Sequence, residues 1–154
     1  MQSVKSKVHK KAARHAARRI TWRKILEVAF WGTVIWGTIR MTANYLGFTP
    51  YGVRSFSRPL LGMGGEGSAW GAVSGLAFLF LLAWGATALY AVWLSRIRLW
   101  WGGLIYGLVW LLVFGFFFRM ANWEESTLST ELGWFLSFGL FIGMTFVAER
   151  AESE

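Results

Sequence analysis

The chain has 154 residues, of which 55% are hydrophobic and 16% are charged, whereas soluble domains carry about 25% charged residues. This length allows one domain, and a soluble core of that size could not hide so much apolar surface, so the composition predicts an integral membrane protein. The net charge is +8. Because cysteine is absent, disulfides, thiolate metal sites and cysteine nucleophiles are excluded.

Residues 1–24 form a basic tail. They hold nine of the 16 Lys and Arg residues, and no acidic residue precedes Glu27. We expect a cytoplasmic tail, with no cleaved signal peptide, that contacts anionic lipid at the inner leaflet. The lipid-contact residues would be Lys7, Lys10, Lys11, Arg14, Arg18 and Arg19. A plain disordered tail and a mitochondrial presequence are alternatives, and nucleic-acid binding is disfavoured because any polycation offers it without specificity.

The first predicted membrane span covers residues 25–46. Its uncharged part is only 12 residues long, between Glu27 and Arg40, so the span must extend past both charges to cross a bilayer. We expect Arg40 to extend its guanidinium into the outer headgroups. Glu27 follows Arg23 by four residues and Lys24 by three, and pairing with them is favoured over an intramembrane role.

Residues 47–68 are predicted to form a long outer loop that contains both prolines. Arg40 and Asn44 share one helix face next to this loop. They could form a polar vestibule with Arg54, Arg58 and Glu66 of the loop. The glycine-rich end of the loop lacks the lysine of a phosphate-binding loop, so nucleotide binding is rejected.

Three further spans are predicted at about 69–94, 99–118 and 132–148. Each lies within a run without charge, and a hydrocarbon core of about 30 Å needs roughly 20 helical residues. The very short turn after residue 94 makes the second and third helices antiparallel neighbours. Residues 25–148 therefore form the membrane domain, and residues 149–154 form a C-terminal tail.

The distribution of basic residues predicts that both termini are cytoplasmic. The two tails and the turn at 95–98 together hold 12 Lys and Arg residues, whereas the opposite side holds three, or four with Arg40. Basic segments resist translocation, so the expected location is the cell membrane, with multiple spans.

Small residues spaced by four recur in the spans and predict close helix packing. The glycines concerned are Gly71, Gly75, Gly103, Gly107, Gly139 and Gly143. The expected fold is an all-α membrane protein, a four-transmembrane-helix bundle.

Three segments resemble a known family. They are YLGFTPYG (45–52), LWWGGLIYGLVW (99–110) and GLFIGMTFVAE (139–149). In these segments the chain resembles the YqhR family of conserved Firmicute membrane proteins over about residues 25–149. The resemblance implies a small membrane protein and carries over no activity to any residue.

No residues are predicted to be catalytic, to bind a cofactor or to bind a metal, and Trp36, Trp84 and Trp110 are expected to pack the core rather than line a pocket. The favoured function is a non-enzymatic scaffold or accessory subunit that binds a membrane partner or forms a homo-oligomer. A small transporter or channel component is the alternative. A membrane enzyme is a disfavoured third reading, because a catalytic acid, a base and metal ligands are missing.

Overall fold

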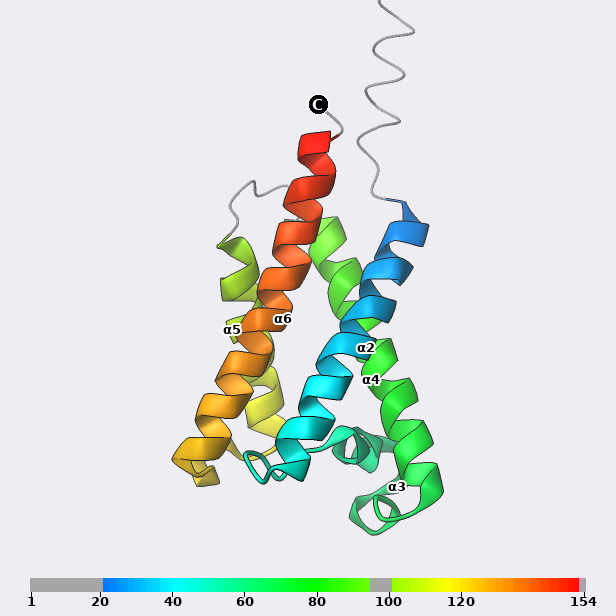
Figure 1. Ribbon diagram of the computed structural model, residues 1–154, viewed down its shortest axis with the longest axis vertical. Helices are drawn as coiled ribbons and strands as arrows, with labels where there is room; N and C mark the ends of the chain where they lie inside the picture. The colour runs from blue at the N-terminus through cyan, green and yellow to red at the C-terminus, as the bar shows by residue number, and fades with distance from the viewer. Residues whose placement is uncertain (1–20, 95–100, 153–154) are drawn as a thin grey trace, which may run out of the picture.

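The computed structural model describes residues 21–94 and 101–152, in which four long helices lie side by side (Figure 1). The elements in chain order are α2 (Trp22–Tyr45), η1 (Val53–Ser57), α3 (Arg58–Leu61), η2 (Met63–Gly65), α4 (Ala69–Leu89), η3 (Tyr90–Leu94), α5 (Gly102–Phe117), η4 (Met120–Asn122) and α6 (Glu125–Glu152). Within these two ranges no strand occurs, so the expectation of an all-helical chain is confirmed there.

Helix α6 differs most from its predicted bounds. It begins at Glu125, seven residues before the expected start at 132, and continues to Glu152. Glu125 lies in the first turn, where a negative charge is favourable near the partial positive charge of a helix N-terminus. The apolar run therefore marks only the middle of this helix, and the polar turn before it contains Glu131.

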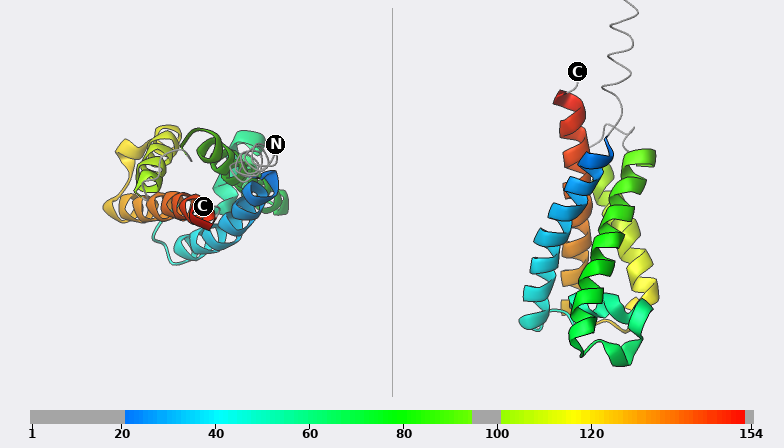
Figure 2. Two further views of the ribbon diagram at one scale, coloured as in Figure 1. Left: turned by 90° about the horizontal axis from the view of Figure 1, so that it is seen from above. Right: turned by 90° about the vertical axis from the view of Figure 1, so that its right-hand side faces the viewer.

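The start of α2 and the end of α6 lie at the same end of the molecule, and the loop after α2 lies at the other (Figures 1 and 2). An ion pair joins the two helices there, since Lys24 Nζ lies 3.3 Å from Glu149 Oε2. We refer to this as the terminal end and to the opposite one as the loop end.

Helices α5 and α6 form the closest helix pair, because glycines remove side chains from both surfaces. A Cβ atom added at Gly103 would clash with the carbonyl oxygen of Gly139, and one added at Gly143 would lie 2.8 Å from the Cα of Gly103. Gly107 lies in the same way against the backbone of Phe135. Close backbone approach of this kind is how membrane helices associate without a hydrophobic driving force.

Helix α4 packs on α2 and on the η1 segment of the loop. The two glycines predicted to pack α4 against another helix contact the loop instead. Gly75 lies against the backbone of Val53, and Gly71 lies against that of Glu66. Over the described residues α4 and α5 have no extensive contact with each other. They meet near the terminal end, where the Tyr106 hydroxyl donates a 2.6 Å hydrogen bond to the carbonyl oxygen of Ala86.

Two helices are long and apolar enough to cross a membrane, namely Ala69–Leu94 and Glu125–Glu152. Helix α5 is equally apolar but has only 16 residues. Several large apolar side chains are exposed on the outside of the molecule, such as Phe116 (84%) and Phe117 (75%). Exposed apolar surface of this extent suits contact with lipid.

Candidate functional site

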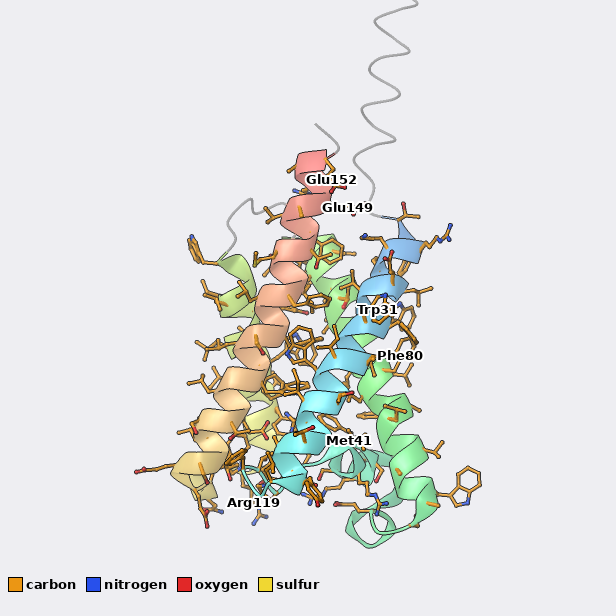
Figure 3. All side chains as sticks on the ribbon, viewed as in Figure 1. Trp31, Met41, Phe80, Arg119, Glu149 and Glu152 are labelled. Carbon is orange, nitrogen blue, oxygen red and sulfur yellow. The ribbon has the colours of Figure 1, made fainter. Side chains whose placement is uncertain are left out.

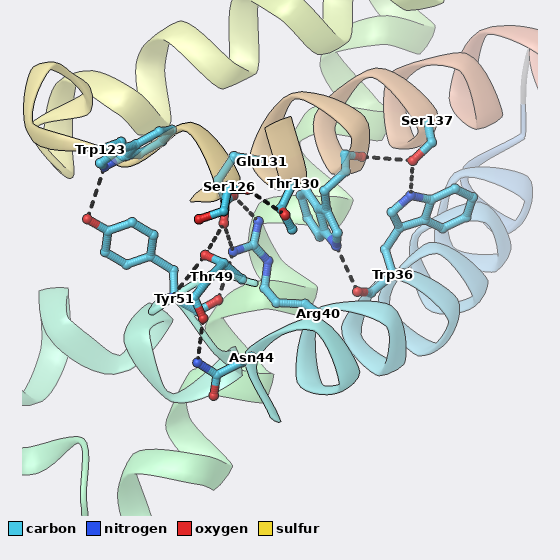
Figure 4. A network of polar contacts seen from close by, with 11 residues as sticks. Trp36, Arg40, Asn44, Thr49, Tyr51, Trp123, Ser126, Thr130, Glu131 and Ser137 are labelled. Carbon is cyan, nitrogen blue, oxygen red and sulfur yellow. Dashed lines mark hydrogen bonds and ion pairs between the residues drawn. The ribbon is translucent and has the colours of Figure 1, made fainter. Parts of the chain in front are cut away.

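A buried ion pair joins α2 to α6 near the loop end (Figure 4). Arg40 Nη2 donates to Glu131 Oε2 at 2.6 Å, and Arg40 Nη1 donates to Glu131 Oε1 at 3.1 Å. Both side chains are only 1% exposed. The paired geometry matches the planar guanidinium to both carboxylate oxygens, which is the strongest arrangement available to these groups. Each charge is thus neutralised by the other.

The loop after α2 completes this ion pair. The Thr49 hydroxyl donates to Glu131 Oε1 at 2.7 Å, and the carbonyl oxygen of Tyr51 accepts a hydrogen bond from Arg40 Nη1 at 3.0 Å. Asn44 in turn donates to the carbonyl oxygen of Thr49 at 2.9 Å. These hydrogen bonds attach the loop to both helices. Among the atoms of the pair, Arg40 Nε is buried without a partner in the described residues.

Aromatic rings surround the Arg40 guanidinium. Its central carbon lies 4.2 Å from the centre of the Trp134 ring, and three more rings lie within 6 Å, those of Phe56, Phe114 and Phe135. A cation over aromatic faces is stabilised by their quadrupoles, most strongly where water is excluded. Trp134 is itself fixed, because its Nε1 donates to the carbonyl oxygen of Trp36 at 2.9 Å.

The same four rings line a cavity of about 1040 Å³ between α4 and α5. This volume is at the upper end of the roughly 300–1,000 Å³ of small-molecule sites. The walls of the cavity are formed by Gly32, Thr33 and Trp36 of α2, by Phe78, Leu79, Leu82, Ala83 and Ala86 of α4, by Trp110, Val113, Phe114 and Phe117 of α5, by Trp134, Phe135 and Phe138 of α6, and by Phe56 of η1. The ion pair therefore lies directly behind one wall of the cavity.

The polar lining residues of the cavity gather at the loop end, and we call Tyr51, Arg58, Arg119, Asn122 and Trp123 the rim. Arg58 forms an ion pair with Glu66. Trp123 Nε1 donates to the Tyr51 hydroxyl at 3.0 Å and to the carbonyl oxygen of Phe118 at 2.9 Å, which ties the loop to the end of α5. Arg119 is exposed and lies at the loop end, far from Glu149 and Glu152 (Figure 3).

The comparisons with known proteins identify the family. The family model described as "Conserved membrane protein YqhR" matches residues 5–154. The chain belongs to the YqhR family. It is 27% identical over 138 residues to the "Uncharacterized protein YqhR" of Bacillus subtilis (strain 168), an alignment that covers 84% of this chain and 77% of the relative. No solved structure matches the chain. The resemblance noted from the sequence is confirmed, and the chain is a helical membrane protein.

In this YqhR-family chain Arg40 does not extend into the headgroups, so that expectation is wrong. The side chain points into the protein and is almost completely buried against Glu131. The carboxylate offers a better partner than the interface, because it can be reached without moving the guanidinium through apolar lipid. Glu131 directly precedes the last uncharged run, so the hydropathy pattern does not place it within the span.

The other predicted polar residues lie apart from the pair or at its edge. Glu27 is exposed, and its Oε2 lies 3.7 Å from Lys24 Nζ. This agrees with the expected pairing between Glu27 and the basic residues before it. Arg54 is exposed and donates to the carbonyl oxygen of Gly67 at 3.4 Å, whereas Arg58 lies on the rim. Asn44 is exposed and touches the pair only through Thr49. The six lipid-contact residues of the basic tail lie outside the described residues.

All three mid-membrane tryptophans pack against the buried core, as expected, but two of them also line the cavity, which was not expected. These are Trp36 and Trp110, whereas Trp84 packs near Trp22 with ring centres 6.3 Å apart. Arg40 and Glu131 have opposite charges and lie about one and a half turns from the loop ends of their helices, hence at similar depth. The similar depth of the two charged residues is visible only once α6 is known to begin at Glu125, because the apolar run starts at residue 132.

Proposed function

We propose that this YqhR-family chain is a non-enzymatic accessory protein of the membrane that holds an apolar or amphipathic molecule between α4 and α5. The observation that carries the proposal is the cavity of about 1040 Å³, whose walls are almost entirely aliphatic and aromatic. Ligand sites are typically concave and apolar, with a few polar groups that fix orientation. The rim would supply these polar groups.

The buried ion pair supports this role by keeping the cavity open. Arg40 contacts four of the rings in the cavity walls, and its bonds to Glu131 and to the loop fix where those rings stand. A site that is formed before its ligand arrives binds more tightly, because less ordering accompanies binding. Since the two charges satisfy each other, the pair favours a structural role over ion transport.

The proposed arrangement in the membrane is a four-helix bundle with four spans and both termini in the cytoplasm. Basic residues concentrate in the tails, and the ion pair between Lys24 and Glu149 supports placing the two ends on one side. Helix α5 is about 24 Å long at 1.5 Å per residue, which a locally thinner bilayer accommodates. The loop end, with the rim, then faces the outside of the cell membrane.

Two further interactions belong to this proposal. The basic tail of residues 1–24 would contact anionic lipid at the inner leaflet, since each basic residue near such a surface contributes about 1 kcal/mol. The exposed apolar faces of the helices would allow a membrane-protein partner or a second copy to bind without occupying the cavity.

Filling the cavity tests the binding function. Leu82 of α4 and Val113 of α5 line the cavity, whereas their neighbours Leu81 and Leu112 are exposed and do not. We expect Leu82→Trp and Val113→Trp to abolish retention of co-purified small molecules in native mass spectrometry, and the matched variants Leu81→Trp and Leu112→Trp to leave it unchanged. Equal retention in all four correctly folded variants would refute a cavity-based function.

A further inference from the structure

We infer that the ligand of the cavity is an anionic phospholipid of the outer leaflet, whose acyl chains occupy the cavity and whose phosphate lies at Arg119. This inference rests on the proposed function and adds the chemical class of the ligand. It follows from the positions of the polar and charged groups of the lining, from which of the two rim arginines has an ion-pair partner, and from the shape of the cavity.

The lining separates polar from apolar groups in the way that a lipid does. Within the walls the one hydroxyl is that of Thr33, and it already donates to the carbonyl oxygen of Ala29 at 2.8 Å. The polar groups of the rim all lie at the loop end. A ligand that satisfies both regions must be apolar over most of its length and polar at one end.

The positive charge at the rim favours a ligand whose polar end is negatively charged. Both charged lining residues are arginines, and Arg58 is neutralised by Glu66. No ion pair of Arg119 occurs among the described residues, and the acidic residues that follow it, Glu124 and Glu125, do not line the cavity. The guanidinium of Arg119 is thus available for a phosphate, which it can bind through paired hydrogen bonds.

The turn after α5 also places Asn122 on the rim, and its side-chain amide is a further hydrogen-bond donor near this arginine. Asn122 N–H donates to the carbonyl oxygen of Arg119 at 2.9 Å, so both residues stay at the mouth of the cavity. Arg119 adopts the left-handed conformation with φ of 53°, which lets the chain reverse direction directly at the end of α5.

A lipid fits the cavity better than a partner helix does. A spanning helix is about 10–12 Å wide and must cross about 30 Å of hydrocarbon. The hydrogen bond from Tyr106 to Ala86 joins α4 to α5 at the terminal end of the cavity, and Phe56, Arg58 and Pro59 of the loop line its other end. Acyl chains are narrow and flexible, and they can enter sideways between α4 and α5, where Val113 and Phe117 of the lining are also exposed to lipid.

The test uses the full chain reconstituted with phosphatidylglycerol or with zwitterionic phosphatidylcholine, and native mass spectrometry counts the retained lipid. We expect the wild type to prefer phosphatidylglycerol and Arg119→Asn to lower this preference about five-fold, since one basic residue near an anionic surface has about that effect. Asn tolerates the left-handed conformation, so this variant should fold. Arg119→Lys should keep the preference, and Arg54→Asn is the matched control, because Arg54 is exposed but does not line the cavity.

The outcomes separate the inference from the proposed function. Equal retention of both lipids by the wild type would overturn the anionic lipid. An equal loss with Arg54→Asn would overturn the position of its phosphate at Arg119. Both outcomes leave a cavity ligand in place. Retention of phosphatidylglycerol by Leu82→Trp at the wild-type level would overturn the cavity itself. Free inorganic phosphate that binds as tightly as phosphatidylglycerol would show that the acyl chains contribute nothing, which also contradicts the inference.

Discussion

Arg40 and Glu131 are 91 positions apart in the chain, and yet they form a paired, almost completely buried ion pair that joins α2 to α6. Removing one partner of a buried pair leaves an uncompensated charge, which typically costs about 3–5 kcal/mol. We therefore expect Arg40→Gln to lower the free energy of unfolding by about that amount, contrary to the neutral effect expected of an arginine at the headgroups. Thermal unfolding in a mild detergent measures the change.

Two comparisons show whether the pair itself is responsible. Arg54→Gln is the control, because Arg54 is an exposed arginine of the adjacent loop, and it should change stability little. The double variant Arg40→Met with Glu131→Leu removes both charges together and should be more stable than Arg40→Gln alone. If Arg40→Gln unfolds like the wild type, the ion pair is not important for stability.

The Thr49 hydroxyl gives a second measure of how the loop supports the ion pair. Thr49→Val keeps the shape of the side chain and removes the hydrogen bond to Glu131 Oε1. A hydrogen bond to a charged group contributes about 1.5–3 kcal/mol, so we expect a loss of stability of that size. Thr42→Val removes a hydroxyl that is exposed and bonds only within its own helix, and it should have a much smaller effect. Similar losses for the two variants would contradict a supporting role for the loop.

The glycine contacts between α5 and α6 predict a clear difference between two glycines of one helix. Gly139→Ala places a methyl group against the backbone of Gly103 and should destabilise the protein by about 1–3 kcal/mol through overpacking. A Cβ at Gly133 has open space around it, so Gly133→Ala should stabilise the helix by up to about 1 kcal/mol. Chemical denaturation in detergent compares the two, and effects of the same sign would contradict the described packing.

The topology can be tested cleanly, because the chain has no cysteine and any introduced thiol is unique. Gly64 lies in the loop and Ala151 lies near the end of α6, and both are exposed. In intact cells a membrane-impermeant maleimide should label Gly64→Cys and leave Ala151→Cys unlabelled until the membrane is opened. Labelling of both sites, or of Ala151→Cys alone, would reject cytoplasmic termini.

The helices themselves could be predicted well from the chain, and the ion pair could not. Long uncharged runs mark α4 and α5 because a lipid-facing helix has no place for charge, whereas α2 extends past charged residues on both sides of its short uncharged run. The start of α6 did not follow from such a run, since Glu131 interrupts the apolar run although it lies inside the helix. A hydropathy pattern records only that a charge is present, not whether another helix neutralises it.

The class of this protein, most of its helical segments, the excess of basic residues at its ends and its family can be inferred from the chain alone, because each depends on local composition or on similarity along the chain. The packing of the helices decides that Arg40 meets Glu131, that aromatic rings from α5, α6 and the loop surround that arginine, and that a cavity opens between α4 and α5. These features depend on how helices distant in the chain pack against each other, and that packing brings together side chains that have no fixed spacing in the sequence.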